Sequence, residues 1–241
     1  IVNSVILEIM KERGFSPQFG AGHSLSEYCA LYAAGVFSFE DGLRLIEKRA
    51  SFMDECSKQT QGSMAAIMGL AEDKLLEICS SIKSIVGPAG YNSPGQIVIS
   101  GEINAVKEAL ALAKQAGAGK CIELKVSGGW HSRLMAPAQD RLESELNKID
   151  FNQPAFPVVS NFTAVAETDV NIIKNSLIKQ LCEPVRWVQS VENLIARNQV
   201  VEFVEAGPGK VLSGLIKRIN NSVKIFNINS VKNMNDYFSG N

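Results

Sequence analysis

The chain has 241 residues, of which 46% are hydrophobic, and can bury a substantial core in one large domain or in a domain with an insert. Its formal net charge of −1 gives no global reason to expect nucleic acid or an anionic membrane as a partner. No apolar run approaches the roughly 18 residues of a transmembrane helix, and no signal-peptide pattern opens the chain. These features predict a soluble protein of the cytoplasm.

Cysteine and histidine usage argues against disulfides and metal sites. The cysteines are odd in number, scattered and never arranged as Cys-X-X-Cys: Cys29, Cys56, Cys79, Cys121 and Cys182. With only two histidines in the chain, a metal centre is not expected either. We predict reduced thiols, no metal and no other cofactor.

The first part of the chain predicts alternating helices and strands. Apolar spacing favours a helix over residues 1–13, a short apolar segment at 19–21, a helix that begins at Glu27, and a helix over 39–56. The pattern changes near residue 62. There, predicted strands alternate with predicted helices at residues 64–68, 71–81, 96–100, 104–116 and 120–126. This order predicts a small ferredoxin-like α+β insert over residues 61–126.

The remaining sequence returns to a larger α/β unit, which we assign to residues 1–60 and 127–241. Its later strands are predicted near residues 157–159 and 201–204, and its later helices over 138–149, 170–181, 187–198 and 211–220. Strands placed between helices predict an α/β-hydrolase-like unit with a parallel sheet covered on both faces. The Asn-rich tail from residue 227 is predicted to be a fraying end.

One short motif indicates chemistry, the pentapeptide Gly22-His23-Ser24-Leu25-Ser26, which lies between the apolar segment and the next helix. A serine on a sharp strand-to-helix turn has an exposed hydroxyl and backbone N–H groups beside it, as in acyl-transfer enzymes. The alternative is a turn serine that caps the following helix. A base able to activate Ser24 would favour the nucleophile.

A serine nucleophile needs a base whose pKa lies near the working pH, and the candidates are His23 and His131. His23 is adjacent to Ser24 on a tight turn, so its side chain is expected to point away from the hydroxyl and to serve as support. His131 follows an apolar segment and two glycines, ahead of the helix predicted at 138–149. Functional residues are frequent in such loops, although a histidine bonded to its own turn is the alternative.

Six motifs occur in an order that resembles the malonyl-CoA:acyl carrier protein transacylase family, and the resemblance extends over about residues 1–229. They are Gly-His-Ser-Leu-Ser-Glu-Tyr at 22–28, Leu-Ile-Glu-Lys-Arg at 45–49, Met-Ala-Ala-Ile-Met-Gly-Leu at 64–70, Asn-Ser-Pro-Gly-Gln at 92–96, Trp-His-Ser-Arg-Leu-Met at 130–135, and Glu-Ala-Gly-Pro-Gly-Lys-Val-Leu at 205–212. The last motif lacks the Gly-X4-Gly-Lys-Ser/Thr spacing of a phosphate loop, so nucleotide binding is not predicted.

The resemblance implies roles for individual residues. Ser24 would be the nucleophile that becomes malonylated, and His131 would be its general base. Arg49 would pair with the free malonyl carboxylate, for which a planar guanidinium is suited, although without the family match it reads as a solvated residue near a helix end. The backbone carbonyl of Gln180 would orient His131, and the N–H of Leu25 would contribute to the oxyanion hole.

A further residue, Asn161, matches a pocket-lining position of the family. Members of the family also begin with a strand and a Gly-Gln-Gly-X-Gln loop that supplies a second oxyanion donor, and no part of this sequence corresponds to it. We expect the sequence to be a fragment without that segment. A molecule lacking one oxyanion donor would turn over roughly a hundred- to a thousandfold more slowly.

The predicted activity is ping-pong transfer of malonyl from malonyl-CoA to the phosphopantetheine thiol of holo acyl carrier protein, for fatty-acid or polyketide synthesis. An acyl-thioester hydrolase is the first alternative, and Arg49 argues against it because a plain acyl chain would leave a buried cation unpaired. An inactive carrier-binding module is the second alternative, and the presence of both Ser24 and His131 argues against that module.

The basic residues Lys210, Lys217 and Arg218 form either a candidate docking surface for an acidic carrier or an ordinary solvated helix face. The preference for malonyl over methylmalonyl stays open.

Overall fold

The structure is a computed structural model that describes residues 1–240, so Asn241 lies outside the described residues. Its helices are α1 (Val2–Glu12), α2 (Ser26–Ala33), α3 (Phe39–Gln59), α4 (Glu72–Ser81), α5 (Ile103–Gln115), the 3₁₀ turn η1 (Arg133–Met135), α6 (Ala136–Leu146), α7 (Val170–Gln180), α8 (Trp187–Ala196), α9 (Val211–Ile219) and α10 (Val231–Ser239). Its strands are β1 (Gly62–Met68), β2 (Val86–Ser93), β3 (Gln96–Glu102), β4 (Lys120–Glu123), β5 (Val158–Val159), β6 (Ala166–Glu167), β7 (Glu202–Ala206) and β8 (Lys224–Ile228). The chain has a mixed α/β fold.

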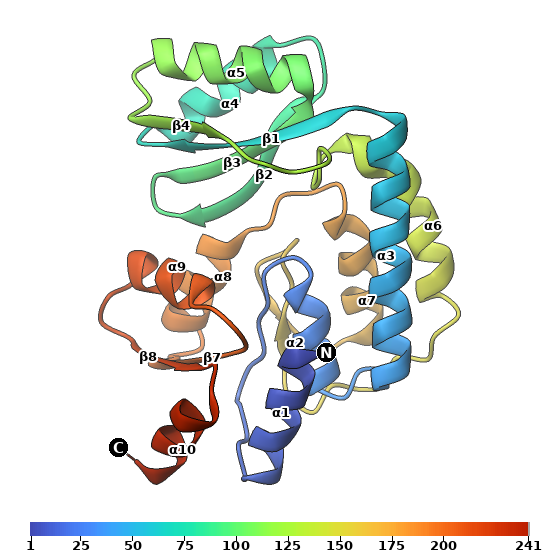
Figure 1. The fold of residues 1–241 in the computed structure, drawn as a ribbon, viewed down its shortest axis with the longest axis vertical. Coiled ribbons are helices and arrows are strands. Elements are labelled where there is room, and N and C mark those ends of the chain that lie inside the picture. The colour runs from blue at the N-terminus through green and yellow to red at the C-terminus, as the bar shows by residue number, and fades with distance from the viewer. Residues whose placement is uncertain (241) are drawn as a thin grey trace.

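A four-stranded antiparallel sheet occupies one end of the molecule, at the top of Figure 1. Its strand order is β2-β3-β1-β4, and the chain passes through it as β1, α4, β2, β3, α5 and β4. Helices α4 and α5 cover one face and bury apolar side chains against Ile67 and Ile99. On the other face, Met64, Ala66 and Val98 pack with Ala89 and the ring of Trp130, which precedes His131.

Strand β2 is a member of this sheet that the sequence pattern did not reveal. Gly87, Pro88 and Gly90 interrupt its apolar alternation, and its register with β3 shifts between Pro88 and Gly90. Glycine and proline are typical of such irregular or bulged strands, which is why periodicity does not detect them. The structure also connects this strand to the rest of the chain, because Val185 N donates to Ala89 O and Tyr91 N donates to Val185 O.

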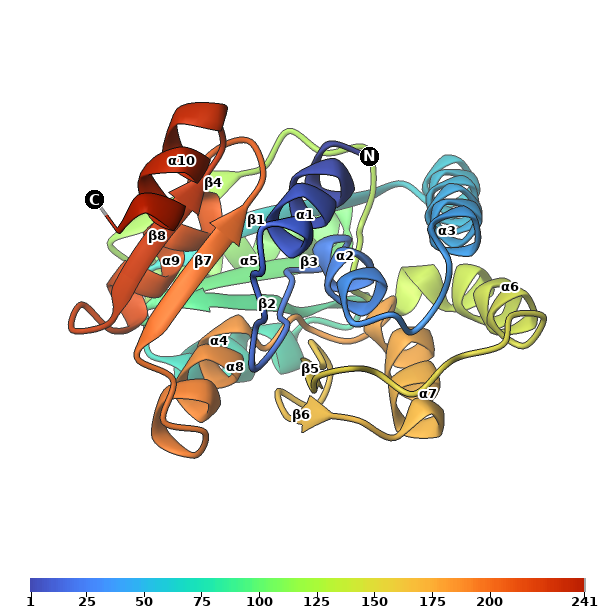
Figure 2. The ribbon, with the colours of Figure 1, turned by 90° about the horizontal axis from the view of Figure 1, so that it is seen from below.

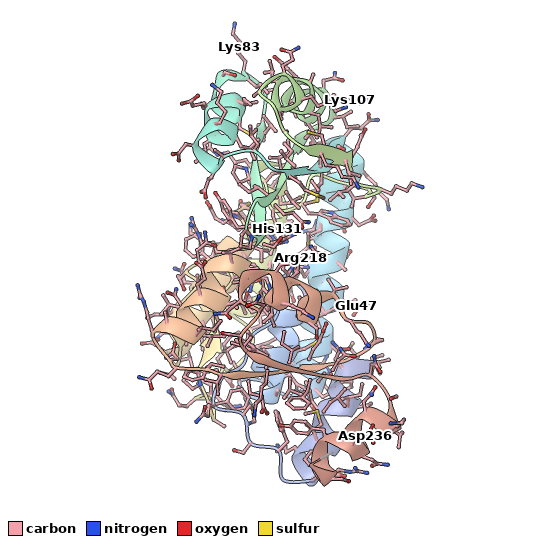
Figure 3. All side chains as sticks on the ribbon, turned by 90° about the vertical axis from the view of Figure 1, so that its left-hand side faces the viewer. Glu47, Lys83, Lys107, His131, Arg218 and Asp236 are labelled. Atoms are coloured by element: carbon pink, nitrogen blue, oxygen red, sulfur yellow. The ribbon has the colours of Figure 1, made fainter. Side chains whose placement is uncertain are left out.

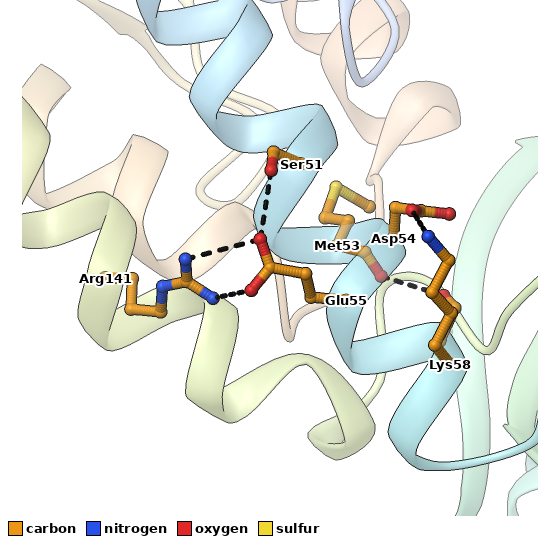
Figure 4. A network of polar contacts seen from close by, with 7 residues as sticks. Ser51, Met53, Asp54, Glu55, Lys58 and Arg141 are labelled. Atoms are coloured by element: carbon orange, nitrogen blue, oxygen red, sulfur yellow. Dashed lines mark hydrogen bonds and ion pairs between the residues drawn. The ribbon is translucent and has the colours of Figure 1, made fainter.

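A helical core lies beside and below the sheet, where α2, α3, α6 and α7 pack together (Figures 1 and 2). Leu45, Leu142 and Leu177 lie within it with exposed fractions of 1% or less. Figure 4 shows polar contacts that support the α3–α6 pairing at its surface: Arg141 donates to both carboxylate oxygens of Glu55, and Ser51 Oγ donates to the same carboxylate. The Arg141 guanidinium also lies over the ring of Phe52, 4.0 Å from its centroid.

The predicted parallel sheet is only partly present among residues 1–240. Parallel pairing is seen between β7 and β8 and in the isolated bridges Gly20–Val158 and Gly90–Val185, whereas β5 and β6 are antiparallel. A cavity of about 760 Å³ lies between residues 18–21 and β7, so these two segments do not pair. The apolar segment at 19–21 therefore makes only the single bridge at Gly20.

The chain end differs from the predicted fraying tail. Strand β8 pairs with β7, and α10 follows it with Ser230 as an N-cap that accepts from Asn233 N. Met234 is 5% exposed and packs with Met10 and Ile228, so burial of an apolar side chain stabilises a helix whose other residues are mostly polar. Within residues 1–240, no helix is long and apolar enough to cross a membrane.

We expect Leu142→Ala to lower the free energy of unfolding by about 2–5 kcal/mol, because it opens a cavity at the centre of the helical core. Urea denaturation followed by circular dichroism measures the change. Leu43→Ala is the matched control, since Leu43 on α3 is 42% exposed and its truncation leaves no cavity. Equal losses for the two variants would contradict the assignment of Leu142 to the core.

Candidate active site

Ser24 lies on a turn immediately before α2, with a left-handed backbone φ of 53°. The turn needs glycine at position 22, because a Cβ there would lie 2.1 Å from the carbonyl carbon of Ser26. The amide of Asn161 bonds the turn on both sides: its Oδ1 accepts from Ser24 N at 2.6 Å, and its Nδ2 donates to Gly22 O at 2.6 Å. Asn161 was predicted to line the pocket, and in the structure its amide bonds the backbone of the serine turn.

The Ser24 hydroxyl contacts His131, which lies ahead of η1 with φ of 56°. Ser24 Oγ and His131 Nε2 are 2.8 Å apart, and His131 Nδ1 is 2.8 Å from the backbone oxygen of Gln180. A carbonyl oxygen only accepts hydrogen bonds, so Nδ1 carries the proton and Nε2 is left to accept the serine proton. The structure thus joins three residues from distant parts of the sequence by hydrogen bonds, and Figure 3 shows His131 near the middle of the long axis.

The surroundings of His131 favour its neutral form. Its side chain is buried, and burial lowers its pKa to about 3, with a further lowering by the positive charge of Arg49. A neutral imidazole with its Nδ1–H held by a carbonyl is the form required of a general base. His131 is therefore neutral, with Nε2 free to accept a hydrogen bond, throughout the physiological pH range.

Arg49 lies within α3, not near its end, and is only 5% exposed. Its Nη2 donates to Ser24 Oγ at 3.0 Å and to Gln180 Oε1 at 3.1 Å, and its guanidinium lies 5.8 Å from the centroid of the Tyr28 ring. Burial lowers the pKa of Arg49, and the nearby Tyr28 and Glu27 side chains oppose this effect. A buried guanidinium with donor capacity beside Ser24 is a ready binding group for an anion.

Leu25 contributes its backbone to the N-terminal end of α2, where it is the N-cap residue. N–H groups at this end of a helix have few partners within the helix and carry the positive end of its dipole. The N–H of Leu25, the residue directly after Ser24, is thus a candidate oxyanion donor, and this role stays a prediction.

His23 points away from the nucleophile and bonds the four-stranded sheet. Its Nε2 is 2.8 Å from Asn92 Oδ1 on β2, and its ring lies 5.7 Å from that of Trp187. Burial lowers the pKa of His23, which favours the neutral ring. The contact with Asn92 links the serine turn to the sheet of residues 62–123, as expected of a supporting residue.

Glu27 is a site residue that sequence reasoning missed. It lies in the first turn of α2, is 2% exposed, and accepts from Asn161 N at 3.1 Å and from Gln180 Nε2 at 2.7 Å, both through Oε2. Burial raises its pKa to about 7. The available signal was its place directly after the serine turn, but an acid in the first turn of a helix is usually a solvated partner of the helix dipole.

No cluster of three or more His, Cys, Asp or Glu side chains able to hold a metal occurs within residues 1–240. The site consists instead of a serine, a neutral histidine, a buried cation and the amides that hold them.

Comparison with known proteins gives the family. Residues 2–235 match the Acyl transferase domain family. A malonyl CoA-acyl carrier protein transacylase of Staphylococcus aureus strain MRSA252 is 43% identical over 235 residues, which cover 96% of this chain and 75% of that protein. The Bacillus subtilis transacylase is 45% identical over 222 residues, which cover 91% of this chain and 70% of that protein. The chain belongs to the malonyl-CoA:acyl carrier protein transacylase family.

Solved structures of transacylases share this fold. The acyl carrier protein S-malonyltransferase of Vibrio cholerae superposes with a TM-score of 0.94 at 40% identity, over 98% of this chain and 78% of that one. A malonyl-transacylase in complex with a type II polyketide acyl-carrier protein superposes with a TM-score of 0.95 at 39% identity, over 100% of this chain and 78% of that one. Family membership thus agrees with the resemblance carried by the six motifs.

We expect Glu27→Gln to gain stability relative to the unsubstituted protein as the pH rises. Glu27 has its pKa raised to about 7 in the folded chain, so its contribution is fully present below the unfolded pKa and is lost as pH rises through about 7. Glutamine does not titrate, so the difference in melting temperature should grow from about pH 4.5, where the unfolded carboxyl ionises, to about pH 7 and stay constant above it. Melting curves of both proteins across this range measure it, and a constant difference would contradict the raised pKa.

Proposed function

We propose that this chain transfers the malonyl group of malonyl-CoA to the phosphopantetheine thiol of holo acyl carrier protein through a malonyl-serine intermediate. The observation that carries the proposal is the position of Arg49: a buried guanidinium donates to the hydroxyl that His131 contacts from the other side. Family membership and the names of the relatives support the same substrates.

In the first half-reaction, His131 Nε2 takes the Ser24 proton as Ser24 Oγ attacks the thioester carbonyl of malonyl-CoA. The negative charge on the former carbonyl oxygen is stabilised by the N–H of Leu25 at the end of α2. The carbon–sulfur bond then breaks, and the proton on His131 passes to the departing thiolate of coenzyme A. The products are free coenzyme A and malonyl-Ser24.

The second half-reaction repeats these steps with the carrier thiol. His131 Nε2 takes the proton of the phosphopantetheine thiol, and the thiolate attacks the malonyl-serine ester. The proton then returns to Ser24 Oγ as the ester bond breaks. Throughout both halves, the carbonyl of Gln180 keeps the imidazole in the tautomer that accepts at Nε2.

Arg49 gives the proposed reaction its acyl preference. Its guanidinium is nearly inaccessible to solvent and donates to neutral oxygens of Ser24 and Gln180, so a malonyl carboxylate would supply a charged acceptor. An acetyl group offers no such partner. The same argument disfavours a plain acyl-thioester hydrolase, because that substrate would leave the cation unpaired in a buried site.

We also infer a two-part architecture for the catalytic chain. The strand order β2-β3-β1-β4 with α4 and α5 on one face supports a ferredoxin-like subdomain over residues 61–126. The parallel β7–β8 pair and the Gly20–Val158 bridge support a hydrolase-like parallel sheet in a large unit of residues 1–60 and 127–241. The proposed substrates belong to cytoplasmic metabolism, so we place the reaction in the cytoplasm.

Mass spectrometry of the intact protein after mixing with malonyl-CoA or acetyl-CoA tests the proposal. We expect a malonyl adduct that is lost in Ser24→Ala. In Arg49→Ala, the ratio of malonyl to acetyl loading should fall by about tenfold or more, as expected for loss of a hydrogen bond to a charged group. Arg44→Ala is the matched control, because Arg44 lies on the same helix with its side chain 75% exposed.

The absence of an adduct on folded protein would contradict the transacylase proposal, with folding checked by circular dichroism. An adduct that persists in Ser24→Ala would contradict the assigned nucleophile. Release of the acyl group to water at the rate of its transfer to holo carrier would favour the hydrolase.

The carrier is proposed to dock on α9, where exposed Lys217 and Arg218 lie in the last turn. Arg218 Nη1 donates to Gln96 Oε1 at 3.1 Å, so this end of the helix faces the four-stranded sheet.

We expect the double reversal Lys217→Glu and Arg218→Glu to raise the KM for holo carrier about tenfold and to leave malonyl loading from coenzyme A unchanged. Steady-state transfer assays measure both, with Lys11→Glu on α1 as the control. An unchanged KM would exclude this surface.

A further inference from the structure

Glu27, Gln180 and Arg49 form a buried chain of polar contacts behind the nucleophile. Gln180 is 1% exposed, and each end of its side-chain amide has defined partners. Its Nε2 donates to Glu27 Oε2 at 2.7 Å and to Ser24 O at 3.2 Å, while its Oε1 accepts from Arg49 Nη2 at 3.1 Å. The proposed reaction uses only the backbone oxygen of Gln180, so its side chain is free to have a separate role.

These contacts allow only one orientation of the Gln180 amide. If the amide were rotated by half a turn, its NH2 group would face the Arg49 guanidinium, which only donates hydrogen bonds. Its oxygen would then face Glu27 Oε2 and Ser24 O, which accept. Because the ends of the amide meet a donor on one side and acceptors on the other, Glu27 and Arg49 select the same orientation.

We infer that Glu27 is a positioning residue: by fixing the Gln180 amide, it holds Arg49 Nη2 beside Ser24 Oγ and so sets the preference for an acyl group with a free carboxylate. The inference rests on the proposed function, since it concerns the same site and substrate. It assigns to the Gln180 side chain the task of aligning the guanidinium, separate from the task of its backbone oxygen on His131.

The chemistry of Glu27 agrees with a hydrogen-bonding role in either charge state. Oε2 makes both of its contacts, to Asn161 N and to Gln180 Nε2. A proton on Oε1 leaves Oε2 free to accept, so the network persists when the carboxyl group is neutral. With a pKa raised to about 7, both forms occur near neutral pH. Glutamine, with its amide oxygen in place of Oε2, makes the same two contacts.

Packing alone does not explain why a carboxyl group is buried at position 27. An apolar side chain of similar length would fill the volume without desolvating an acid. Such a side chain would leave Gln180 Nε2 and Asn161 N without their shared acceptor, and the amide of Gln180 would lose the contact that orients it. Replacing Glu27 by methionine therefore removes the acceptor and keeps the volume, which makes it the informative variant.

The test compares rates of single-turnover loading from malonyl-CoA and from acetyl-CoA, followed by quenched-flow mass spectrometry. We expect Glu27→Met to lower the malonyl-to-acetyl rate ratio by about tenfold, the effect of misplacing one hydrogen bond to a charged group. Glu27→Gln should restore the ratio to within about twofold of the unsubstituted protein. The control is Glu47→Met, because Glu47 is exposed on α3, the helix that carries Arg49.

A second variant tests whether the Gln180 side-chain amide connects Glu27 to Arg49. Gln180→Met removes the side-chain amide and keeps the backbone oxygen that contacts His131, so it should lower the same ratio by about tenfold. Combining it with Glu27→Met should lower the ratio no further, because both changes act on one contact. The Gln180 variant also keeps the proposal testable if Glu27→Met fails to fold.

Three results would overturn the positioning role. They are an unchanged ratio in folded Glu27→Met or in folded Gln180→Met, additive losses in the double variant, and a ratio as low in Glu27→Gln as in Glu27→Met. Failure of the proposed function looks different, because the unsubstituted protein would then form no malonyl-Ser24 at all.

Discussion

Burial of the Arg49 guanidinium is the constraint on which the rest of the site depends. A cation taken out of water is costly unless polar partners surround it, and here those partners are the Ser24 hydroxyl and the Gln180 amide. The same charge lowers the pKa of His131 and counteracts the effect of burial on Glu27. Nucleophile, base and acid therefore respond to one positive charge, and a substrate carboxylate would complete its coordination.

The pairing of two helices brings Arg49 and His131 into the same site. Arg49 lies on α3, and His131 lies just before η1 and α6, which packs along α3. Leucines of the helical core bring the helices together, and the Arg141–Glu55 contact links them at the surface (Figure 4). The Arg141 guanidinium also lies over the Phe52 ring. An exposed ion pair of this kind adds little stability, so the buried leucines account for most of the pairing.

Local sequence carries much of this site but not all of it. The turn at Gly22-His23-Ser24 and the loop before His131 could be predicted because glycine spacing and residue chemistry mark them directly, and the family motifs added Arg49 and Gln180. Glu27 could not be assigned, since burial of an acid depends on which loops cover it. Strand β2 has no clean alternation, the pairing of β7 with β8 is a long-range contact, and α10 depends on Met234 meeting Met10. Such features are set by tertiary packing, which no window of sequence contains.

Ser24 and His131 share a strained backbone conformation that costs stability. Both have φ near +55°, in the left-handed region that residues with a Cβ rarely adopt, and each such residue costs about 1–3 kcal/mol of conformational strain. Glycine would relieve the strain at either position and would remove the reacting group. The two residues on which the chemistry depends are thus places where the folded chain gives up stability, so selection for thermal robustness alone would tend to erase this active site.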